Sequence, residues 1–335
     1  MDATHASSVP GLRLRPFAGD ADFPLMARVA NASFAADGQH SVRRPEDMRR
    51  DYAAFTSWDP SRDIRMAEID GELVGYARTW DWTADDGAFV QGQLAFVHPD
   101  WRRRGVGTVL LQWLERRQRE IARAHPHAPA WLHHAFVTEG EQDRMHLLRK
   151  AGYRPVRHFL EMERRGLDDI PDVPLPAGFE IRPVETEHLR AIYDAHITAL
   201  QDHWGMARQK PEYFEGWQKS RTFQPHLWQV AWHVESRQVA GQVKPWIDAE
   251  QNETQQRRRG YTEFISVGAP WRRRGLARAL VLRALRAQRE AGMDESALGV
   301  DGENAHDAAR LYEACGFRVV KRNAVYRKPV DFGAP

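Results

Sequence analysis

Apolar residues along the chain follow two spacings, one typical of buried strands and one typical of helices. Short apolar runs end at Val97 and at Val267, and a basic turn follows each run. Beyond each turn the apolar residues recur at helical spacing. In the first case they are Val109, Leu110, Trp113, Leu114 and Ile121, and in the second they are Leu276, Leu280, Ala284 and Leu285.

Two pairs of apolar runs precede these turns and predict β-hairpins. Residues 64–68 and 73–79 flank Asp70 and Gly71, and Asp-Gly between apolar runs is a strong hairpin signal. Residues 228–232 and 239–243 have the same relation across a polar stretch at 235–238. Strands and helices in this order predict a mixed α/β protein.

The chain contains two copies of one pattern. Trp-Arg-Arg-Arg-Gly occurs at 101–105 and again at 271–275, an offset of 170 residues. Leu-Arg-Pro at 14–16 corresponds to Ile-Arg-Pro at 181–183, and Ala-Gly-Tyr-Arg-Pro-Val at 151–156 corresponds to Cys-Gly-Phe-Arg-Val-Val at 315–320. Landmarks that recur in one order indicate an internal duplication.

A stretch rich in proline and glycine, at 165–178, separates the two copies and is typical of an exposed linker. We therefore predict an N-terminal domain over residues 1–167, a linker over 168–177 and a C-terminal domain over 178–335. Each copy is expected to contain a strand, one or two helices, the hairpin, a strand, the basic turn, a helix, a strand, a helix and a final pair of strands.

Composition narrows the functional classes. With 335 residues, 42% of them hydrophobic and 28% charged, the chain is typical of a globular protein with two cores. A formal charge of +2 gives no general attraction to nucleic acid or to an anionic membrane, and neither is expected as a partner. The single cysteine, Cys315, forms no intramolecular disulfide, and no Cys/His spacing resembles a metal site. A reducing cytoplasm is the expected compartment.

The two basic turns are candidate phosphate-binding sites. A helix N-terminus presents unpaired N–H groups, small residues let a diphosphate approach the backbone, and arginines add charge-assisted contacts. The alternative is a solvated basic cluster in which glycine only fixes the turn, and recurrence in one strand-turn-helix context favours phosphate. The predicted contacts are Arg102, Arg103, Arg104, Gly105, Val106 and Gly107, and Arg272, Arg273, Arg274, Gly275, Leu276 and Ala277.

These residues resemble a known family. Arg-x-x-Gly-x-Gly/Ala after a strand ending in valine resembles the coenzyme A pyrophosphate loop of the GNAT acetyltransferase superfamily, and residues 298–317 resemble its later motif. The resemblance covers nearly the whole chain, once per copy, and the tandem arrangement is similar to that of the mycothiol synthases. It implies two tandem GNAT domains, each a mixed, mostly antiparallel sheet flanked by helices.

The resemblance also implies direct transfer of an acetyl group from acetyl-CoA to a primary amine of a small molecule, in the C-terminal domain. The strand at 264–267 is expected to splay from its neighbour and pair with the pantetheine arm, with an N–H near Val267 facing the thioester oxygen. Asn304 would contact the cofactor, or only cap a helix. The remaining residues implied to contact the cofactor are Ile265, Ser266 and Val267, and Phe96 and Val97 in the first copy.

Proton transfer is assigned by the same resemblance. Tyr312 would donate a proton to the departing thiolate, because a phenol with a pKa of ~10 is protonated at neutral pH; its alternative role is a core aromatic. Glu263 would be the general base, or a strand carboxylate in a cross-strand pair. Asp202, His203 and Trp204 would line the acceptor site, where His203 could serve only as a hydrogen-bonding wall residue.

The first copy departs from the pattern. Alignment of the copies places Leu148 at the position of Tyr312 and Gln93 at that of Glu263. We predict that this copy is catalytically silent, whether or not it binds coenzyme A. An acyl-CoA sensor and an aminoacyl-tRNA-dependent aminoacyltransferase stay open as other functions, although the modest charge is unfavourable for the latter. The acceptor, the acyl chain and the choice between monomer and homodimer also stay open.

Overall fold

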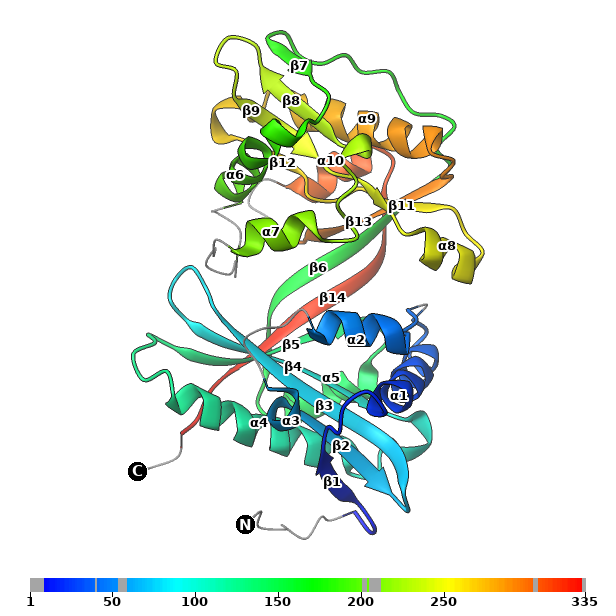
Figure 1. Cartoon of the computed structure of the whole chain (residues 1–335), viewed down its shortest axis with the longest axis vertical. Helices are drawn as coiled ribbons and strands as arrows, with labels where there is room; N and C mark the ends of the chain where they lie inside the picture. The colour runs from blue at the N-terminus through cyan, green and yellow to red at the C-terminus, as the bar shows by residue number, and fades with distance from the viewer. Residues whose placement is uncertain are drawn as a thin grey trace. The chain divides into compact units, whose positions relative to one another are not determined.

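The computed structural model describes residues 9–39, 41–53, 59–200, 204, 212–303 and 307–332. Contacts divide the chain into two compact units (Figure 1). Unit 1 contains residues 1–157 together with 323–335, and unit 2 contains residues 158–322. Within the described ranges, no helix has the length and apolar character needed to span a bilayer.

Unit 1 is built on one sheet in the order β1-β2-β3-β4-β5-β14. β4 and β5 are parallel, and the other neighbouring pairs in this sheet are antiparallel. The strands are β1 (Arg13–Pro16), β2 (Ile64–Ile69), β3 (Glu72–Thr83), β4 (Phe89–Val97), β5 (Trp131–Thr138) and β14 (Arg318–Pro329). The helices are α1 (Asp22–Ala36), α2 (Pro45–Ala53), α3 (Pro60–Asp63), α4 (Val106–Arg123) and α5 (Gln142–Lys150).

Alternation of side chains along β2 and β3 gives this sheet two apolar faces. Met66 and Tyr76 pack with residues of α1 and α2 on one face. Ala67 and Ala77 pack with residues of α4 on the other. The sheet is therefore covered on both sides, as the predicted α/β class requires.

Unit 2 has two sheets, in the orders β12-β9-β8-β7 and β6-β13-β11-β10. Its strands are β6 (Arg154–Arg165), β7 (Phe179–Ile181), β8 (Gln229–His233), β9 (Val239–Val243), β10 (Trp246–Ile247), β11 (Arg259–Tyr261), β12 (Ser266–Val267) and β13 (Glu295–Asp301). Its helices are α6 (Leu189–Ala199), α7 (Glu212–Gln218), α8 (Ala249–Gln255), α9 (Leu276–Glu290) and α10 (Ala308–Ala314). One core cluster joins α9 to both sheets, through Ala240 of β9 and Leu298 of β13.

Several sequence predictions are confirmed. Both hairpins form, and Asp70 and Gly71 adopt φ values of 50° and 81° at the first turn. Parallel pairs are limited to β4 with β5 and β11 with β13, so the sheets are mixed and mostly antiparallel among the described strands. The basic turns are each followed by a long helix, α4 or α9.

The predicted final pair of strands is wrong. Each copy ends in one strand of 12 residues, β6 or β14, because no glycine divides residues 154–165 or 318–329. Residues 159–165 of β6 pair with β13 in unit 2, and residues 323–329 of β14 pair with β5 in unit 1. Each unit is thus completed by the last strand of the other copy. The boundary at 168–177, which follows the order of the copies, stays a prediction.

Candidate active site

A fork between strands lies at the centre of unit 2. β11 runs parallel to β13 as far as the pair Tyr261–Ala297, and the Thr262 N–H donates to the Ala297 carbonyl at 2.8 Å. Phe264 then adopts a φ of 51°, and the chain pairs with β9 as β12. β13 continues to Asp301 along β6. The expected splay of this segment is therefore present, although only Ser266 and Val267 of residues 264–267 are in strand conformation.

Unit 1 contains the corresponding fork, but a side chain occupies it. β4 pairs with β5 as far as Gln93–Ala135, and the remainder of β4 pairs with β3. Arg144 of α5 donates to the Gln93 carbonyl at 3.4 Å and forms an ion pair with Glu141 at 2.9 Å. When Gly152 is aligned with Gly316, the residue that corresponds to Arg144 is Ala308. The fork of unit 2 therefore lacks this arginine.

The two basic turns share one backbone conformation. Arg103 and Arg273 have φ values of 61° and 63°, and Gly105 and Gly275 have values of 92° and 83°. Glycine adopts this left-handed region without the strain that a Cβ atom causes. The helix that follows each turn leaves its first N–H groups without intrahelical partners and carries a partial positive charge there. The two turns therefore present the same backbone to solvent, and anion binding by either one stays a prediction.

The first arginine of each turn points into the protein. The Arg272 guanidinium donates to the Val267 carbonyl at 3.1 Å and to the Ala199 carbonyl, at the end of α6, at 3.2 Å. Arg102 likewise forms an ion pair of 2.6 Å with Asp37, at the end of α1. These arginines fasten the turn to the first helix of their unit.

The later arginines of the turns are exposed. Arg103 forms an ion pair with Asp143 at 2.8 Å, and Arg104 lies over Trp101 with 5.0 Å between the guanidinium carbon and the ring centroid. Arg273 and Arg274, in the turn of unit 2, are exposed. The sequence predicts charge-assisted contacts with phosphate for Arg272 as well as for these two residues, but the Arg272 guanidinium bonds to backbone carbonyls.

Tyr312 is buried in the core cluster that also contains Leu276, the first residue of α9. Its side chain is 7% exposed, and its ring lies 6.3 Å from that of Phe317 in an edge-on arrangement. Burial raises the pKa of the Tyr312 phenol above its usual range, so the hydroxyl is protonated at neutral pH. Its surroundings suit a core aromatic, and its protonation state suits a proton donor; the catalytic role stays a prediction.

Glu263 immediately precedes the left-handed Phe264. The Trp246 indole N–H donates to its carboxylate at 3.0 Å, and the Trp246 ring stacks on Tyr261 with centroids 4.3 Å apart. Burial raises the pKa of Glu263, and the hydrogen bond from Trp246 opposes that effect. The cross-strand alternative would give Glu263 a basic partner, and the part of the chain that the structure describes shows none.

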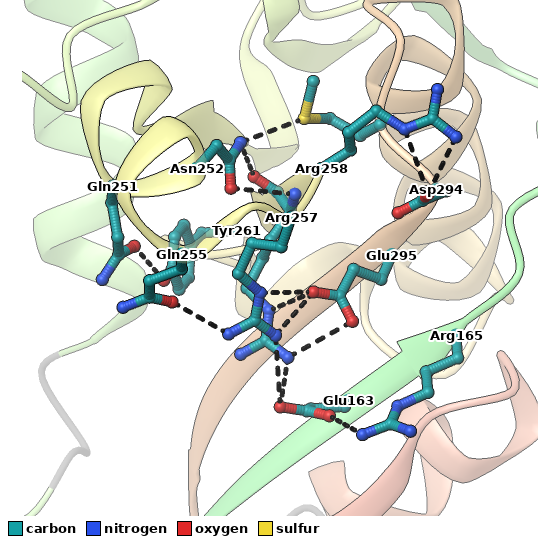
Figure 2. A network of polar contacts seen from close by, with 12 residues as sticks. Glu163, Arg165, Gln251, Asn252, Gln255, Arg257, Arg258, Tyr261, Asp294 and Glu295 are labelled. Atoms are coloured by element: carbon teal, nitrogen blue, oxygen red, sulfur yellow. Dashed lines mark hydrogen bonds and ion pairs between the residues drawn. The ribbon is translucent and has the colours of Figure 1, made fainter. Parts of the chain in front are cut away.

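Figure 2 shows the polar network that holds the beginning of this strand. Arg259 of β11 donates to Glu295 of β13 at 3.0 Å and also contacts Glu163 of β6. Asn252 of α8 pairs with the Arg259 backbone through two hydrogen bonds of 2.9 and 3.0 Å. Burial alone would raise the pKa of Glu295, but the bonds from Arg259 and Arg257 hold it below its usual range. The network fixes β11, and so positions the segment that carries Glu263.

Sequence reasoning missed Lys244, whose N–H donates to the Glu263 carbonyl at 3.0 Å. Its side chain is 2% exposed, and its Nζ lies 5.0, 5.4 and 5.7 Å from the ring centroids of Trp217, Phe264 and Trp228. Burial lowers the pKa of Lys244 to about 7. In the sequence, a lysine directly after an apolar strand is typical of an exposed strand end. The only sequence feature that could have indicated burial of Lys244 is the presence of tryptophans in neighbouring segments.

The other predicted residues are buried, half-buried or outside the described residues. Ser266 is buried, with its hydroxyl 3.0 Å from Nδ1 of His196. Trp204 is half-buried, whereas Asp202, His203 and Asn304 lie outside the described residues. Phe96 is buried against α1, and Ile265, Val97 and Val267 are half-buried.

The residues of unit 1 that replace the proton-transfer candidates are buried. Gln93 donates from its amide to the Tyr153 hydroxyl at 3.0 Å, and Leu148 is 2% exposed. Burial raises the pKa of Cys315, in unit 2, to about 11, which makes its thiol a poor nucleophile. No group of three or more metal-ligating side chains occurs within the ranges that the structure describes.

Comparison with known proteins shows the same duplication, because one family matches the chain twice. The model of the acetyltransferase (GNAT) family matches residues 32–153 and again residues 189–317. A mycothiol acetyltransferase of Kineococcus radiotolerans is 31% identical over 323 residues, covering 93% of this chain and 93% of its own length. A mycothiol acetyltransferase of Nocardiopsis dassonvillei is 28% identical, covering 90% of this chain and 92% of its own length.

Solved structures show the same arrangement. A GCN5-related N-acetyltransferase from Sphaerobacter thermophilus is 27% identical, with a TM-score of 0.75 over 97% of this chain and 98% of its own. A tandem GNAT protein from the clavulanic acid biosynthesis pathway is 17% identical, with a TM-score of 0.66 over 97% of this chain and 99% of its own, and shows the fold alone. The tandem fold thus extends over the whole length of these chains.

Proposed function

This chain belongs to the acetyltransferase (GNAT) family and is an acyltransferase, and from that premise we propose that it transfers an acetyl group from acetyl-CoA to a primary amine of a small molecule. The second copy is the proposed catalytic one. One observation carries the proposal: residues 259–277 combine, in a single stretch, the strand fork, the half-buried carboxylate of Glu263 and the glycine turn that begins α9.

The turn of unit 2 fits a diphosphate. Apart from its chain neighbours, no atom of the described residues lies within 4 Å of the position that a Cβ atom of Gly275 would take, so the approach to the backbone is open. The N–H groups of Leu276 and Ala277 would hold the phosphates, and exposed Arg273 and Arg274 would add charge. When bound, acetyl-CoA supplies an acyl group activated as a thioester.

Two side chains of unit 2 would move the protons. The Glu263 carboxylate would accept a proton from the amine acceptor, and its raised pKa brings it nearer to the operating pH of a general base. The Tyr312 phenol, protonated at neutral pH, would donate to the departing thiolate. An N–H near Val267 would stabilise the developing oxyanion.

Unit 1 would not catalyse transfer. It has Leu148 and Gln93 at the positions of Tyr312 and Glu263, and neither side chain can exchange a proton at neutral pH. Arg144 additionally occupies its strand fork. The first copy therefore contributes structure, together with the strand that completes unit 2.

The first test is Tyr312→Phe, assayed with acetyl-CoA and a panel of primary amines. The panel includes mycothiol-type acceptors, because relatives carry that name. We expect turnover to fall by about 100-fold, the usual contribution of a general acid, while the Kd for acetyl-CoA stays within about twofold. The matched control is Tyr153→Phe, a buried tyrosine of unit 1. Turnover that survives in Tyr312→Phe would contradict the assigned role, and a panel without any acetylated amine would contradict the function.

A further inference from the structure

Unit 1 contains a cavity of about 280 Å³ between α2 and the sheet. Its apolar lining comes from Met48 of α2, Leu94 of β4 and the rings of Tyr52 and Tyr76. Tyr76 is 1% exposed and Tyr52 is 8% exposed, so these walls belong to the core of the unit. Ligand sites commonly combine such an apolar lining with a few fixed polar groups.

The polar groups of the cavity are predominantly cationic. Arg78 of β3 and Arg43, just before α2, face it together with one carboxylate, Asp51. Burial raises the pKa values of the Tyr52 and Tyr76 phenols, and both guanidinium groups lower them, so both lie close enough to act on the same space. The two cations exceed the single anion, and the cavity favours an anionic ligand.

Aromatic rings hold the Arg78 guanidinium in place. Its central carbon lies 4.8 Å from the Tyr52 ring centroid and 5.0 Å from that of Trp80. The Trp80 ring lies over Gly92 of β4, where a Cβ atom would come within 2.3 Å of the ring. Gly92 therefore provides the space for the tryptophan that supports Arg78. Tyr52 also shares a side-chain hydrogen bond with Arg78. These contacts orient the guanidinium, and a guanidinium can form two parallel hydrogen bonds to a carboxylate.

The second copy repeats this arrangement with a different cation. Gly75 pairs with Val97 and Gly241 pairs with Val267, so the residues three positions later, Arg78 and Lys244, correspond. Lys244 lies against Trp217 of α7, as Arg78 lies against Tyr52 of α2. Both copies therefore keep a cation at the corresponding position, within the third strand in the first copy and directly after it in the second, against an aromatic ring of their second helix.

We propose that the cavity of unit 1 binds a small organic carboxylate. The carboxylate pairs with the Arg78 guanidinium, and the apolar body of the ligand contacts Met48 and Leu94. Arg43 adds a second positive charge at the exposed side, while Asp51 disfavours polyanions. This site is separate from the acetyl transfer proposed for unit 2 and gives the silent copy a function of its own.

The test uses isothermal titration calorimetry of the full chain with hexanoate and benzoate, and with hexanamide, benzamide and inorganic phosphate. We expect the carboxylates to bind and the neutral amides to bind at least about tenfold more weakly, because they lose the charged hydrogen bond. Arg78→Met should weaken carboxylate binding by about 10- to 100-fold. Phosphate that binds as well as the carboxylates would overturn the ligand class.

Two further variants locate the site. Arg65→Met removes an arginine stacked on Trp113, with 5.1 Å between the guanidinium carbon and the ring centroid, on the α4 face of the sheet, and binding should be unchanged. Leu94→Trp fills the cavity but keeps both arginines, and binding should be lost. Carboxylate binding that persists in both Arg78→Met and Leu94→Trp, or that is absent from the wild-type chain, would overturn the proposal. Either result is independent of turnover in unit 2.

Discussion

Burial moves the pKa values of two neighbouring residues at the fork in unit 2, Lys244 and Glu263, toward neutrality. The pKa of Lys244 is lowered to about 7, and that of Glu263 is raised. Burial favours the neutral form of each, since the charged form loses its hydration. Such shifts occur where proton transfer takes place, and in this chain they flank the left-handed Phe264. The electrostatics of the fork are therefore testable one residue at a time.

Trp246→Phe should change the pH dependence of acetyl transfer. The indole N–H stabilises the charged carboxylate of Glu263, so its loss raises the pKa further, and the rate rises with pH only at higher values than in the wild type. Profiles of kcat/KM against pH measure this shift. Glu263→Gln should abolish the rise of kcat/KM with pH. Trp131→Phe, which removes an indole donor in unit 1, is the control, and an unshifted limb in Trp246→Phe would exclude Glu263 as the base.

Lys244→Met should stabilise the protein near pH 8. Between the folded pKa of about 7 and the ordinary value of 10.5, the unfolded chain binds a proton that the folded chain does not, so wild-type stability rises with pH across that window. Each tenfold change in proton affinity corresponds to about 1.4 kcal/mol, so at pH 8 the variant gains up to about 3 kcal/mol.

Urea unfolding of the wild type and Lys244→Met at pH 8 and pH 10 measures this gain. The difference in unfolding free energy should shrink as the pH approaches 10.5, because Lys244 of the unfolded wild type then begins to lose the proton that the folded state already lacks. Lys150→Met, at an exposed lysine of unit 1, should show no such gain. A difference that stays constant with pH would mean that the Lys244 amine is not desolvated in solution.

At the scale of elements, the two ends of α9 allow the backbone strain caused by a glycine substitution to be distinguished from its effect on cofactor binding. Gly275 and Gly292 lie at the two ends of α9, with φ values of 83° and 86°. Apart from chain neighbours, a Cβ atom at either position meets no atom of the described part of the chain within 4 Å. Alanine at either site should therefore cost about 1 kcal/mol of stability through backbone strain alone. Any further difference between the two variants reports on a ligand.

Gly275→Ala should weaken acetyl-CoA binding at least about tenfold, because the new methyl group occupies space that the diphosphate needs. Gly292→Ala, with the same expected loss of stability, should bind acetyl-CoA like the wild type. Calorimetric titration with acetyl-CoA compares the three proteins. Equal affinity in Gly275→Ala and Gly292→Ala would show that the diphosphate binds elsewhere.

Elements with a local signal were predictable from the sequence, and those decided by competition for sheet edges were not. The hairpin at Asp70 and Gly71, the basic turns and the helices after them follow from residue type and periodicity. The left-handed Phe264, which divides the predicted strand, has no signal in a bulky aromatic residue. At the site, Tyr312 and Glu263 were predicted from a resemblance to a family, and their roles stay predictions. The burial of Lys244 depends on tryptophans brought together by the fold and has no such signal.

At the scale of the whole molecule, the two compact units do not coincide with the two copies of the sequence pattern, because each unit includes the last strand of the other copy. Unit 1 needs residues 323–329 to cover the edge of β5, and unit 2 needs residues 159–165 to cover the edge of β13. An uncovered strand edge presents unpaired N–H and carbonyl groups and promotes aggregation. Each unit therefore draws on both copies, and we predict that halves separated at residues 168–177 do not fold independently.

Separate expression of residues 1–167 and 178–335 tests this conclusion. Each fragment lacks the strand that completes its sheet, so we expect both to aggregate when produced alone and to become soluble when produced together. In a full chain with a protease site inserted at 168–177, cleavage should leave the halves associated on size exclusion, since each half supplies a paired strand to the other unit. A soluble 178–335 fragment that binds acetyl-CoA by itself would show that the second copy keeps its own sheet edge covered without β6.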